Sequence, residues 1–172
     1  ELVFNDSSPK IDGQYIAWRY VPVTNMINIT VHVTYAPQLD YSPGIAIYWS
    51  KMGNYQYDFG NLGISIDFNH GKIWMYEPNG NTYVIYSSLP GVSPPYAFTF
   101  TVILTENSAG NVTVYAVYIN GTQYVVNVNT PMPWSQIGYV GLRGYEGNLF
   151  YVSYFAVSPA PYGGAEGFVD NV

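Results

Sequence analysis

Apolar and polar residues alternate with a period of two along most of the chain. This is the pattern of β-strands that bury one face and expose the other. In residues 28–35, NITVHVTY, the alternation places Ile29, Val31, Val33 and Tyr35 on one face. The polar residues between them would line the opposite face, so we expect a half-buried strand here.

The same alternation recurs in nine further segments, which are separated by Gly, Pro and Asn-Gly turn signals. In residues 96–105 it predicts a buried face made of Phe98, Phe100, Val102 and Leu104. The other expected strands are residues 44–50, 63–69, 71–77, 82–87, 111–119, 122–129, 137–144 and 148–158. No segment of helical length shows a 3.6-residue period. Ten or eleven short strands without a long helix predict an all-β fold, an antiparallel jelly-roll-like β-sandwich.

Turn chemistry indicates which of these strands are neighbours. Asn-Gly between two alternating segments is a strong hairpin signal, because both residues tolerate positive φ. Asn79-Gly80 therefore predicts one hairpin and Asn120-Gly121 a second. The glycine at position 71 favours a third hairpin, between residues 63–69 and the segment after it.

Proline and glycine divide the chain into three parts. We expect an N-terminal strand and linker at 1–13, the β-sandwich domain at 14–158, and a Pro/Gly linker with a C-terminal strand at 159–172. An open sheet edge leaves backbone groups unpaired, and a strand from a neighbouring molecule can satisfy them. The candidate residues of such donated strands are Leu2, Phe4, Phe168 and Val172. The alternative is that both ends fold back onto their own sheet.

The composition is poor in charge and rich in aromatic residues. Charged residues make up 9% of the chain, against about 25% in typical soluble domains. The net charge of -6 argues against nucleic acid as a partner, since that function needs a basic patch. No apolar run is long enough to span a membrane. A surface of amides, hydroxyls and rings suits an acidic, hot environment, where carboxylates are protonated and ion pairs are lost; the alternative is an ordinary secreted β-protein.

The chain begins at Glu1 without a leader, so we expect a mature protein from which a signal peptide has been removed, located outside the cell or on its surface. Four N-x-[ST] triplets fit this location, and we expect all four to face water. Their asparagines, the candidate glycosylation sites, are Asn5, Asn28, Asn111 and Asn120. The alternative is that they are ordinary polar β-residues in a chain rich in Asn and Thr.

The sequence contains no recognisable catalytic motif. Glycoside hydrolysis needs two carboxyl groups about 5–10 Å apart, and only Glu166 and Asp170 lie within four residues of each other. A pair could assemble from separate strands, for example Asp67 with Glu77 across a hairpin. There is no G-x-S-x-G nucleophile elbow. We therefore expect neither an enzyme nor a cofactor.

Two binding chemistries are open. Asp67 and Asn69 begin a D-x-N-x-G pattern like that of a calcium loop, but the distant glutamate is missing, so a plain turn is the alternative. The two histidines offer too few ligands for a histidine-based zinc site. Trp49 and Trp74 are candidates for stacking on carbohydrate, although strand tryptophans also serve as core or cross-strand partners.

The second half of the chain resembles the concanavalin A-like, or laminin G-like, jelly-roll superfamily. The resemblance is carried by FTFTVILTENSAGNVTVYAVYINGTQYVVNV followed by IGYVGLRGYEGNLFYVSYFAV, and it covers about residues 96–158. It implies a jelly roll, a fold that hosts lectins, hydrolases and inert modules. The E-x-D-x-x-E strand of laminarinase-type enzymes and the legume-lectin metal cluster are absent from this sequence.

In composition and layout the chain is also similar to subunits of archaeal extracellular filaments, the thread type. That similarity implies a non-enzymatic, glycosylated structural or adhesive subunit, a homopolymer assembled by donor-strand exchange. The alternative is a carbohydrate-binding concanavalin A-like module of a secreted or cell-surface protein, with glycans as partners. A glycosidase built from distant carboxylates is the third hypothesis.

Overall fold

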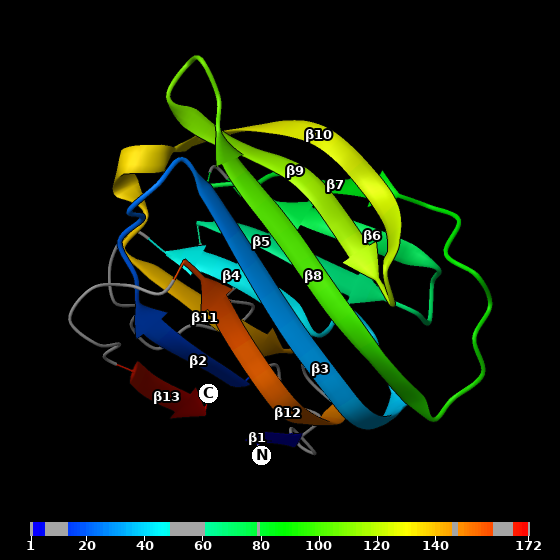
Figure 1. Cartoon of the computed structure of the whole chain (residues 1–172). Coiled ribbons are helices and arrows are strands. Elements are labelled where there is room, and N and C mark those ends of the chain that lie inside the picture. Colours follow the sequence, from blue (N-terminus) through cyan, green and yellow to red (C-terminus); the bar gives the residue numbers. More distant parts are fainter. Residues whose placement is uncertain are drawn as a thin grey trace.

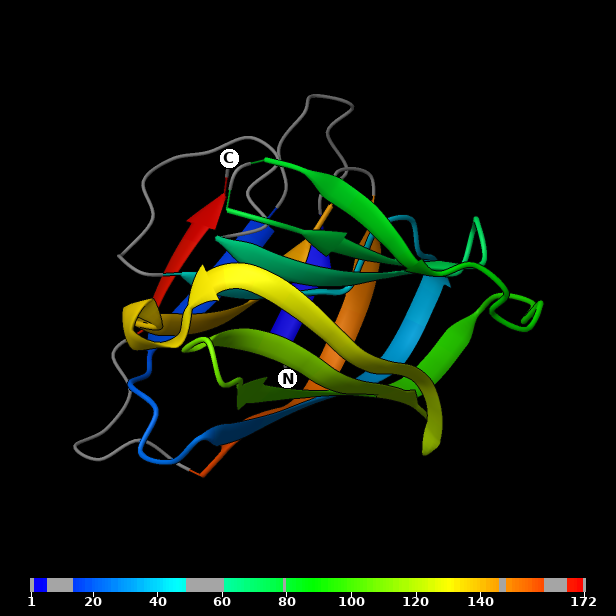
Figure 2. The same cartoon turned by 90° about the horizontal axis from the view of Figure 1, so that it is seen from above.

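A computed structural model describes residues 2–5, 14–48, 61–78, 80–145, 148–159 and 167–171. Its strands form two antiparallel sheets that pack face to face as a β-sandwich (Figures 1 and 2), which confirms the predicted fold class. In these residues the helical structure is limited to one 3-10 turn, Trp134–Gln136. The described part of the chain holds no helix of the length and hydropathy that a membrane span requires.

The first sheet has six strands in the order β1-β12-β3-β8-β9-β10. Their bounds are β1 Leu2–Asn5, β3 Met26–Gln38, β8 Tyr96–Glu106, β9 Asn111–Ile119, β10 Thr122–Pro133 and β12 Leu149–Ser158. The second sheet has seven strands in the order β13-β2-β11-β4-β5-β6-β7. Their bounds are β2 Gln14–Arg19, β4 Gly44–Tyr48, β5 Leu62–Asp67, β6 Lys72–Tyr76, β7 Thr82–Tyr86, β11 Tyr139–Gly144 and β13 Gly167–Asn171.

The expected buried face of β8 is confirmed, since Phe98, Phe100, Val102 and Leu104 are all buried between the sheets. On β3 the predicted buried face is confirmed for Ile29, Val31 and Val33. It is wrong for Tyr35, whose side chain is 41% exposed. The pairing of β3 shifts register against both neighbours near this position. A bulge moves the following side chains to the opposite face.

The expected hairpins are present. Chain reversal at Asn120-Gly121 joins β9 to β10, and both residues have positive φ, 49° and 79°. The β6–β7 pair flanks Gly80, whose φ is 86°, and the β5–β6 pair turns through Gly71 at φ 68°. These glycines stand where an L side chain would strain the backbone.

The described residues form thirteen strands. Eleven of them, β2–β12, lie within residues 14–158, in agreement with the ten or eleven expected for the sandwich, and the other two are the terminal strands β1 and β13. Strand β2 was the one not recognised in the sequence. β1 pairs with β12 and β13 with β2, so each lies at the outer edge of one sheet. The edges of β7 and β10 approach each other on the opposite side of the sandwich.

Candidate functional site

Three segments meet on the outer face of the seven-stranded sheet and bring acidic, imidazole and aromatic side chains together. They are the β3–β4 connection, the β5–β6 hairpin and the residue that follows β11. We call this group the acid–aromatic cluster. Its members are Asp40, Tyr41, Asp67, His70, Trp74 and Tyr145.

The β5–β6 hairpin supplies half of the cluster because its turn is capped by its own carboxylate. Asp67 Oδ1 accepts the backbone N–H of His70 at 3.1 Å. Gly71 then reverses the chain, and its N–H donates to the carbonyl of Phe68 at 3.3 Å. Asp67 thereby faces Lys72 across the hairpin, and Trp74 follows on the same face of β6.

The β3–β4 connection is held in place by Asn148, the residue before β12. The N–H of Asp40 donates to Asn148 Oδ1 at 2.8 Å, and Asn148 Nδ2 donates to the carbonyls of Asp40 and Tyr145, both at 3.0 Å. The Asn69 N–H donates to the carbonyl of Leu39 at 3.3 Å. One buried amide therefore connects two of the segments that form the cluster.

Asp67 is the centre of the cluster and is fully buried. Its Oδ2 accepts the indole N–H of Trp74 at 3.0 Å and lies 2.8 Å from His70 Nδ1. Asp40 Oδ1 lies 3.2 Å from the same His70 nitrogen. The imidazole, whose side chain is 45% exposed, thus bridges two carboxylates.

The environment of Asp40 disfavours its charged form. Burial raises the pKa of Asp40 above its ordinary value of 3.8, the negative charge of Asp67 adds to that rise, and His70 opposes it. Asp40 therefore holds its proton to a higher pH in the folded chain than in the unfolded chain.

Replacing Asp40 with asparagine should alter how stability depends on pH. The folded state binds the Asp40 proton more tightly than the unfolded state does. The stabilisation from this proton is therefore complete below about pH 3.8 and is lost as pH rises through the raised pKa of Asp40. Asp40→Asn removes this loss, so the free energy of unfolding of the variant relative to wild type should increase as pH rises from 3 to 7. Urea unfolding at a series of pH values measures the difference, and a constant difference would contradict the assignment.

Three rings form the aromatic half of the cluster. The centroid of Tyr41 lies 5.6 Å from that of Trp74 and 5.3 Å from that of Tyr145. Tyr41 holds its position with a positive φ of 54°, a conformation that is uncommon for a residue with a bulky side chain. All three side chains are half-buried, so each offers part of its surface to solvent.

Cationic side chains accompany the rings. Lys72 Nζ lies 5.3 Å from the centroid of Trp74, and the guanidinium carbon of Arg143 lies 5.3 Å from that of Tyr145. Burial raises the pKa of Tyr76, which therefore keeps its phenol proton. The face carries hydrogen-bond donors and acceptors beside its rings.

Asp67 and Glu77, the example of a carboxylate pair that could assemble across a hairpin, do not face each other. The register of the hairpin places Asp67 opposite Lys72, at the turn, and Tyr76 opposite Gly63, at the far end. The carboxylate close to Asp67 is instead that of Asp40, twenty-seven positions earlier in the chain. Nothing in the local sequence pattern connects these two residues.

The ligand atoms of Asp40, Asp67 and His70 lie within 4.8 Å of one another, which is close enough to hold a metal ion. Of the expected calcium pair, Asp67 belongs to this group, while the side chain of Asn69 is exposed on the turn. The same nitrogen and oxygen atoms already contact one another within the cluster. Direct contacts of 2.8 and 3.2 Å between these atoms therefore hold the three side chains together, and calcium binding at Asp67 stays a prediction.

The structure describes one of the two tryptophans that were candidates for stacking on carbohydrate. Trp74 lies in the cluster, with its N–H bonded to Asp67. Trp49 lies outside the described residues. Sequence reasoning did not single out Tyr41 or Tyr145, because the chain has 19 tyrosines, and it set His70 aside because the chain has two histidines. The proximity of the three arises from tertiary contacts.

The candidate glycosylation sites occupy different environments. Asn120 is exposed at the β9–β10 turn, while Asn28 and Asn111 are half-buried. The side chain of Asn5 lies outside the described set. The Oδ1 of Asn120 accepts the N–H of Thr99 at 2.9 Å, and a sugar on Nδ2 would leave that bond in place.

The candidate donor strands pair within their own chain. Phe4 is buried and stacks on Phe150 with centroids 4.6 Å apart. Leu2 packs half-buried against the core. Phe168 is opposite Ala17 in the β13–β2 ladder. Val172 falls outside the described residues.

Comparison with known proteins gives one relative of high identity. The chain is 56% identical over 168 residues to the protein named "Putative transmembrane protein ORF1334" of Acidianus two-tailed virus, an archaeal virus. The match covers 94% of this chain and 12% of that protein. This chain therefore corresponds to a small part of its relative. No family model matches the sequence.

Solved structures establish the fold. A human galectin-16 variant superimposes with a TM-score of 0.54 and 9% identity, covering 84% of this chain and 94% of the galectin. An alginate lyase in complex with an alginate tetrasaccharide gives a TM-score of 0.48 and 12% identity, covering 93% and 80%. The galectin has the same jelly-roll-like sandwich architecture, so the fold that the sequence resemblance implied is confirmed. The resemblance to archaeal filament subunits stays a prediction.

Proposed function

We propose that this chain is a non-enzymatic, extracellular glycan-binding and adhesive module of a larger protein, and that the acid–aromatic cluster is its binding site. The observation that carries the proposal is the half-exposed wall of Tyr41, Trp74 and Tyr145, with ring centroids 5.3 and 5.6 Å apart. N-linked sugars at the candidate asparagines would fit the same location.

The chemistry of the cluster matches what a sugar requires. A pyranose ring has an apolar face that packs on an aromatic ring and a rim of hydroxyls that both donate and accept hydrogen bonds. Amphipathic rings such as Tyr and Trp present an apolar body and a polar tip. Asp40 and His70 stand beside the rings as an acceptor and a donor.

The burial of Asp67 favours binding over hydrolysis. Glycosidases place two carboxyl groups against the scissile bond, as nucleophile or base and as acid. Here one carboxyl of the close pair is fully buried and accepts bonds from His70 and Trp74. Asp67 therefore has no exposed oxygen with which to contact a substrate, and the pair is suited to holding the site in shape.

Replacing Trp74 with alanine should weaken glycan binding at least tenfold, because the largest ring of the wall is lost. A glycan array identifies the ligand, and calorimetry with the best oligosaccharide measures the affinity. Trp74→Phe keeps a ring without the indole N–H and should retain part of the binding. Tyr115→Ala is the matched control, since Tyr115 is 42% exposed on the other sheet. Wild-type affinity in Trp74→Ala, or no glycan bound by the wild-type chain, would contradict the proposal.

Self-assembly by strand exchange is the second candidate function. It is favoured by the position of both terminal strands at sheet edges on one side of the sandwich, as Figure 1 shows. An edge strand can leave its own sheet and pair with the vacated edge of a neighbour.

Phe4 is the side chain on which exchange through β1 would depend, because it is buried against Phe150. If wild-type chains form fibres or high-mass species, Phe4→Ala should abolish them. Val3→Ala should not, because Val3 is 54% exposed on the same strand. Light scattering coupled to size exclusion measures both. A wild-type chain that stays at 19.2 kDa at all concentrations would rule out this candidate.

A further inference from the structure

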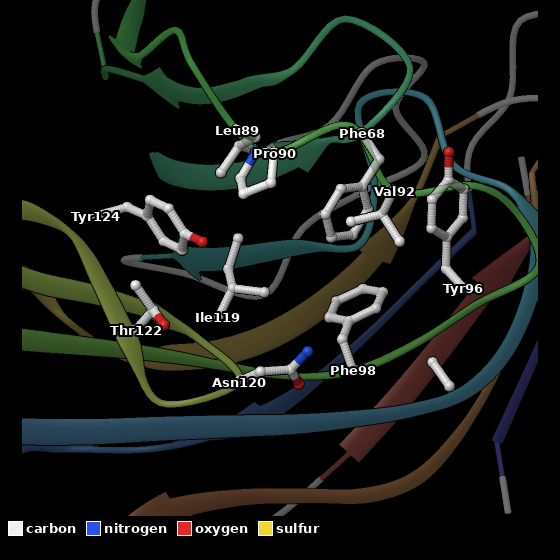
Figure 3. Close-up of a pocket in the computed structure, with 11 residues that line it drawn as sticks. Phe68, Leu89, Pro90, Val92, Tyr96, Phe98, Ile119, Asn120, Thr122 and Tyr124 are labelled. Carbon is white, nitrogen blue, oxygen red and sulfur yellow. The ribbon is translucent and has the colours of Figure 1, made fainter.

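A cavity of about 130 Å³ opens between the two sheets and shares no lining residue with the acid–aromatic cluster. It lies where the β9–β10 hairpin meets the end of β5 and the connection between β7 and β8 (Figure 3). The space is partly open to solvent, since Val92, Asn120 and Thr122 in its lining are exposed. A partly enclosed hollow lined by rings and a few polar groups is a candidate binding site.

One end of the cavity is built from aromatic rings. Phe68 stacks on Tyr96 with centroids 4.8 Å apart and an interplanar angle of 12°. Phe98 meets Phe68 edge-on, with centroids 5.0 Å apart and an angle of 77°. An aromatic ligand ring could extend this arrangement, because offset-stacked and edge-to-face pairs are the favoured geometries.

The other end is polar but uncharged. Figure 3 shows Asn120, Thr122 and Tyr124 lining this end, with the hydroxyl of Tyr124 directed toward the middle of the space. Asn120 is held firmly, since its backbone N–H donates to the carbonyl of Thr99 and its Oδ1 accepts the Thr99 N–H, both at 2.9 Å. None of the described residues that line the cavity carries a charge.

The connection between β7 and β8 covers the cavity. Leu89 anchors it, with its N–H donating to the carbonyl of Gly71 at 3.0 Å and its side chain only 8% exposed. Val92, three residues later, lines the same cavity and is 51% exposed. The position of Val92 marks the side from which a ligand would enter.

We infer that this cavity is a binding site for a single phenolic ring. Its volume is similar to that of apolar protein cavities, about 150 Å³, that hold benzene. The aromatic end fits the face and edge of a ring, and the polar end offers hydroxyl and amide partners for one ligand hydroxyl. The absence of a charged lining residue disfavours an ionised ligand. The ligand is either a free phenol or a tyrosine side chain presented by a polypeptide.

The test is a titration of the chain with p-cresol, toluene and p-hydroxybenzoate, followed by methyl NMR of Leu89, Val92 and Ile119. We expect saturable shifts at these methyls, with p-cresol binding more tightly than toluene and the carboxylate at least tenfold more weakly. N-acetyltyrosinamide distinguishes the sources. Binding of this probe as well as p-cresol supports a tyrosine side chain, and binding of p-cresol alone supports a free phenol.

Two matched variants locate the site. Val92→Phe should place its own ring at the cavity and lower p-cresol affinity at least tenfold. Val126→Phe makes the same change at a position that is 61% exposed and does not line the cavity, so it should bind as wild type. The inference is overturned if the wild-type methyls show no saturable shift, if toluene and p-hydroxybenzoate bind as well as p-cresol, or if Val126→Phe loses as much affinity as Val92→Phe.

Discussion

Gly141→Ala should destabilise the sandwich by about 3 kcal/mol, at the upper end of what overpacking costs. A Cβ at this position would lie 2.5 Å from the carbonyl oxygen of Ile16 and 3.0 Å from the Cβ of Ala17. Both contacts belong to the adjacent strand β2. Strand β11 is paired to β2 on one side and to β4 on the other, so it cannot move away without disrupting a ladder.

Chemical unfolding of Gly141→Ala and Gly91→Ala measures this effect against a matched control. A Cβ at Gly91 would meet nothing within 4 Å. Gly91→Ala should therefore stay within about 0.5 kcal/mol of wild type, as surface substitutions usually do. Equal stability of the two variants would show that β2 and β11 are less closely apposed than described.

Asp67→Ala should cost about 2–3 kcal/mol of stability and should also remove glycan binding. The substitution takes away the acceptor for the Trp74 indole N–H and for the backbone N–H and ring of His70. The donors belong to half-buried Trp74 and exposed His70 and can turn to water, so each lost bond costs about 0.5–1.5 kcal/mol. One effect acts the other way, because losing Asp67 relieves its repulsion of Asp40. The stability lost with three hydrogen bonds exceeds the stability gained from the reduced repulsion.

Asn69→Ala is the control for Asp67→Ala. Asn69 lies in the same turn, and its described contact is made by the backbone N–H, which the substitution keeps. We expect a change within about 0.5 kcal/mol and normal glycan binding. Thermal unfolding and calorimetry with the same oligosaccharide give both quantities. If Asp67→Ala were as stable as Asn69→Ala, the central role of Asp67 in the cluster would be refuted.

Local pattern was a reliable guide where one face of a strand is buried. Phe98 and Phe100 are buried as predicted, because every second side chain of β8 must lie between the sheets. Tyr35 departs from the pattern, since a register shift depends on the neighbouring strands and cannot be seen in β3 alone. β2 was overlooked because its six residues, QYIAWR, show no apolar–polar alternation.

The candidate site was predictable only in fragments. Trp74 stood out by its residue type and Asp67 by its turn pattern. Their partner Asp40 lies on another connection, and Asn148, more than a hundred positions further along the chain, holds Asp40 there. A hydrogen bond between residues so far apart in sequence leaves no periodic signal in either segment.

The sequence by itself determined the all-β class, most strand positions and the turns, because period-two burial and the positive φ of Asn-Gly pairs are local properties. Only the tertiary structure decided how strands that no tight turn joins are ordered in the sheets, that both described terminal strands lie at sheet edges, and that Asp40, Asp67 and His70 converge. The physical reason is that sheet order and side-chain convergence come from pairing between distant segments. Many strand orders bury the same alternating residues, and the packing of the whole chain selects one of them.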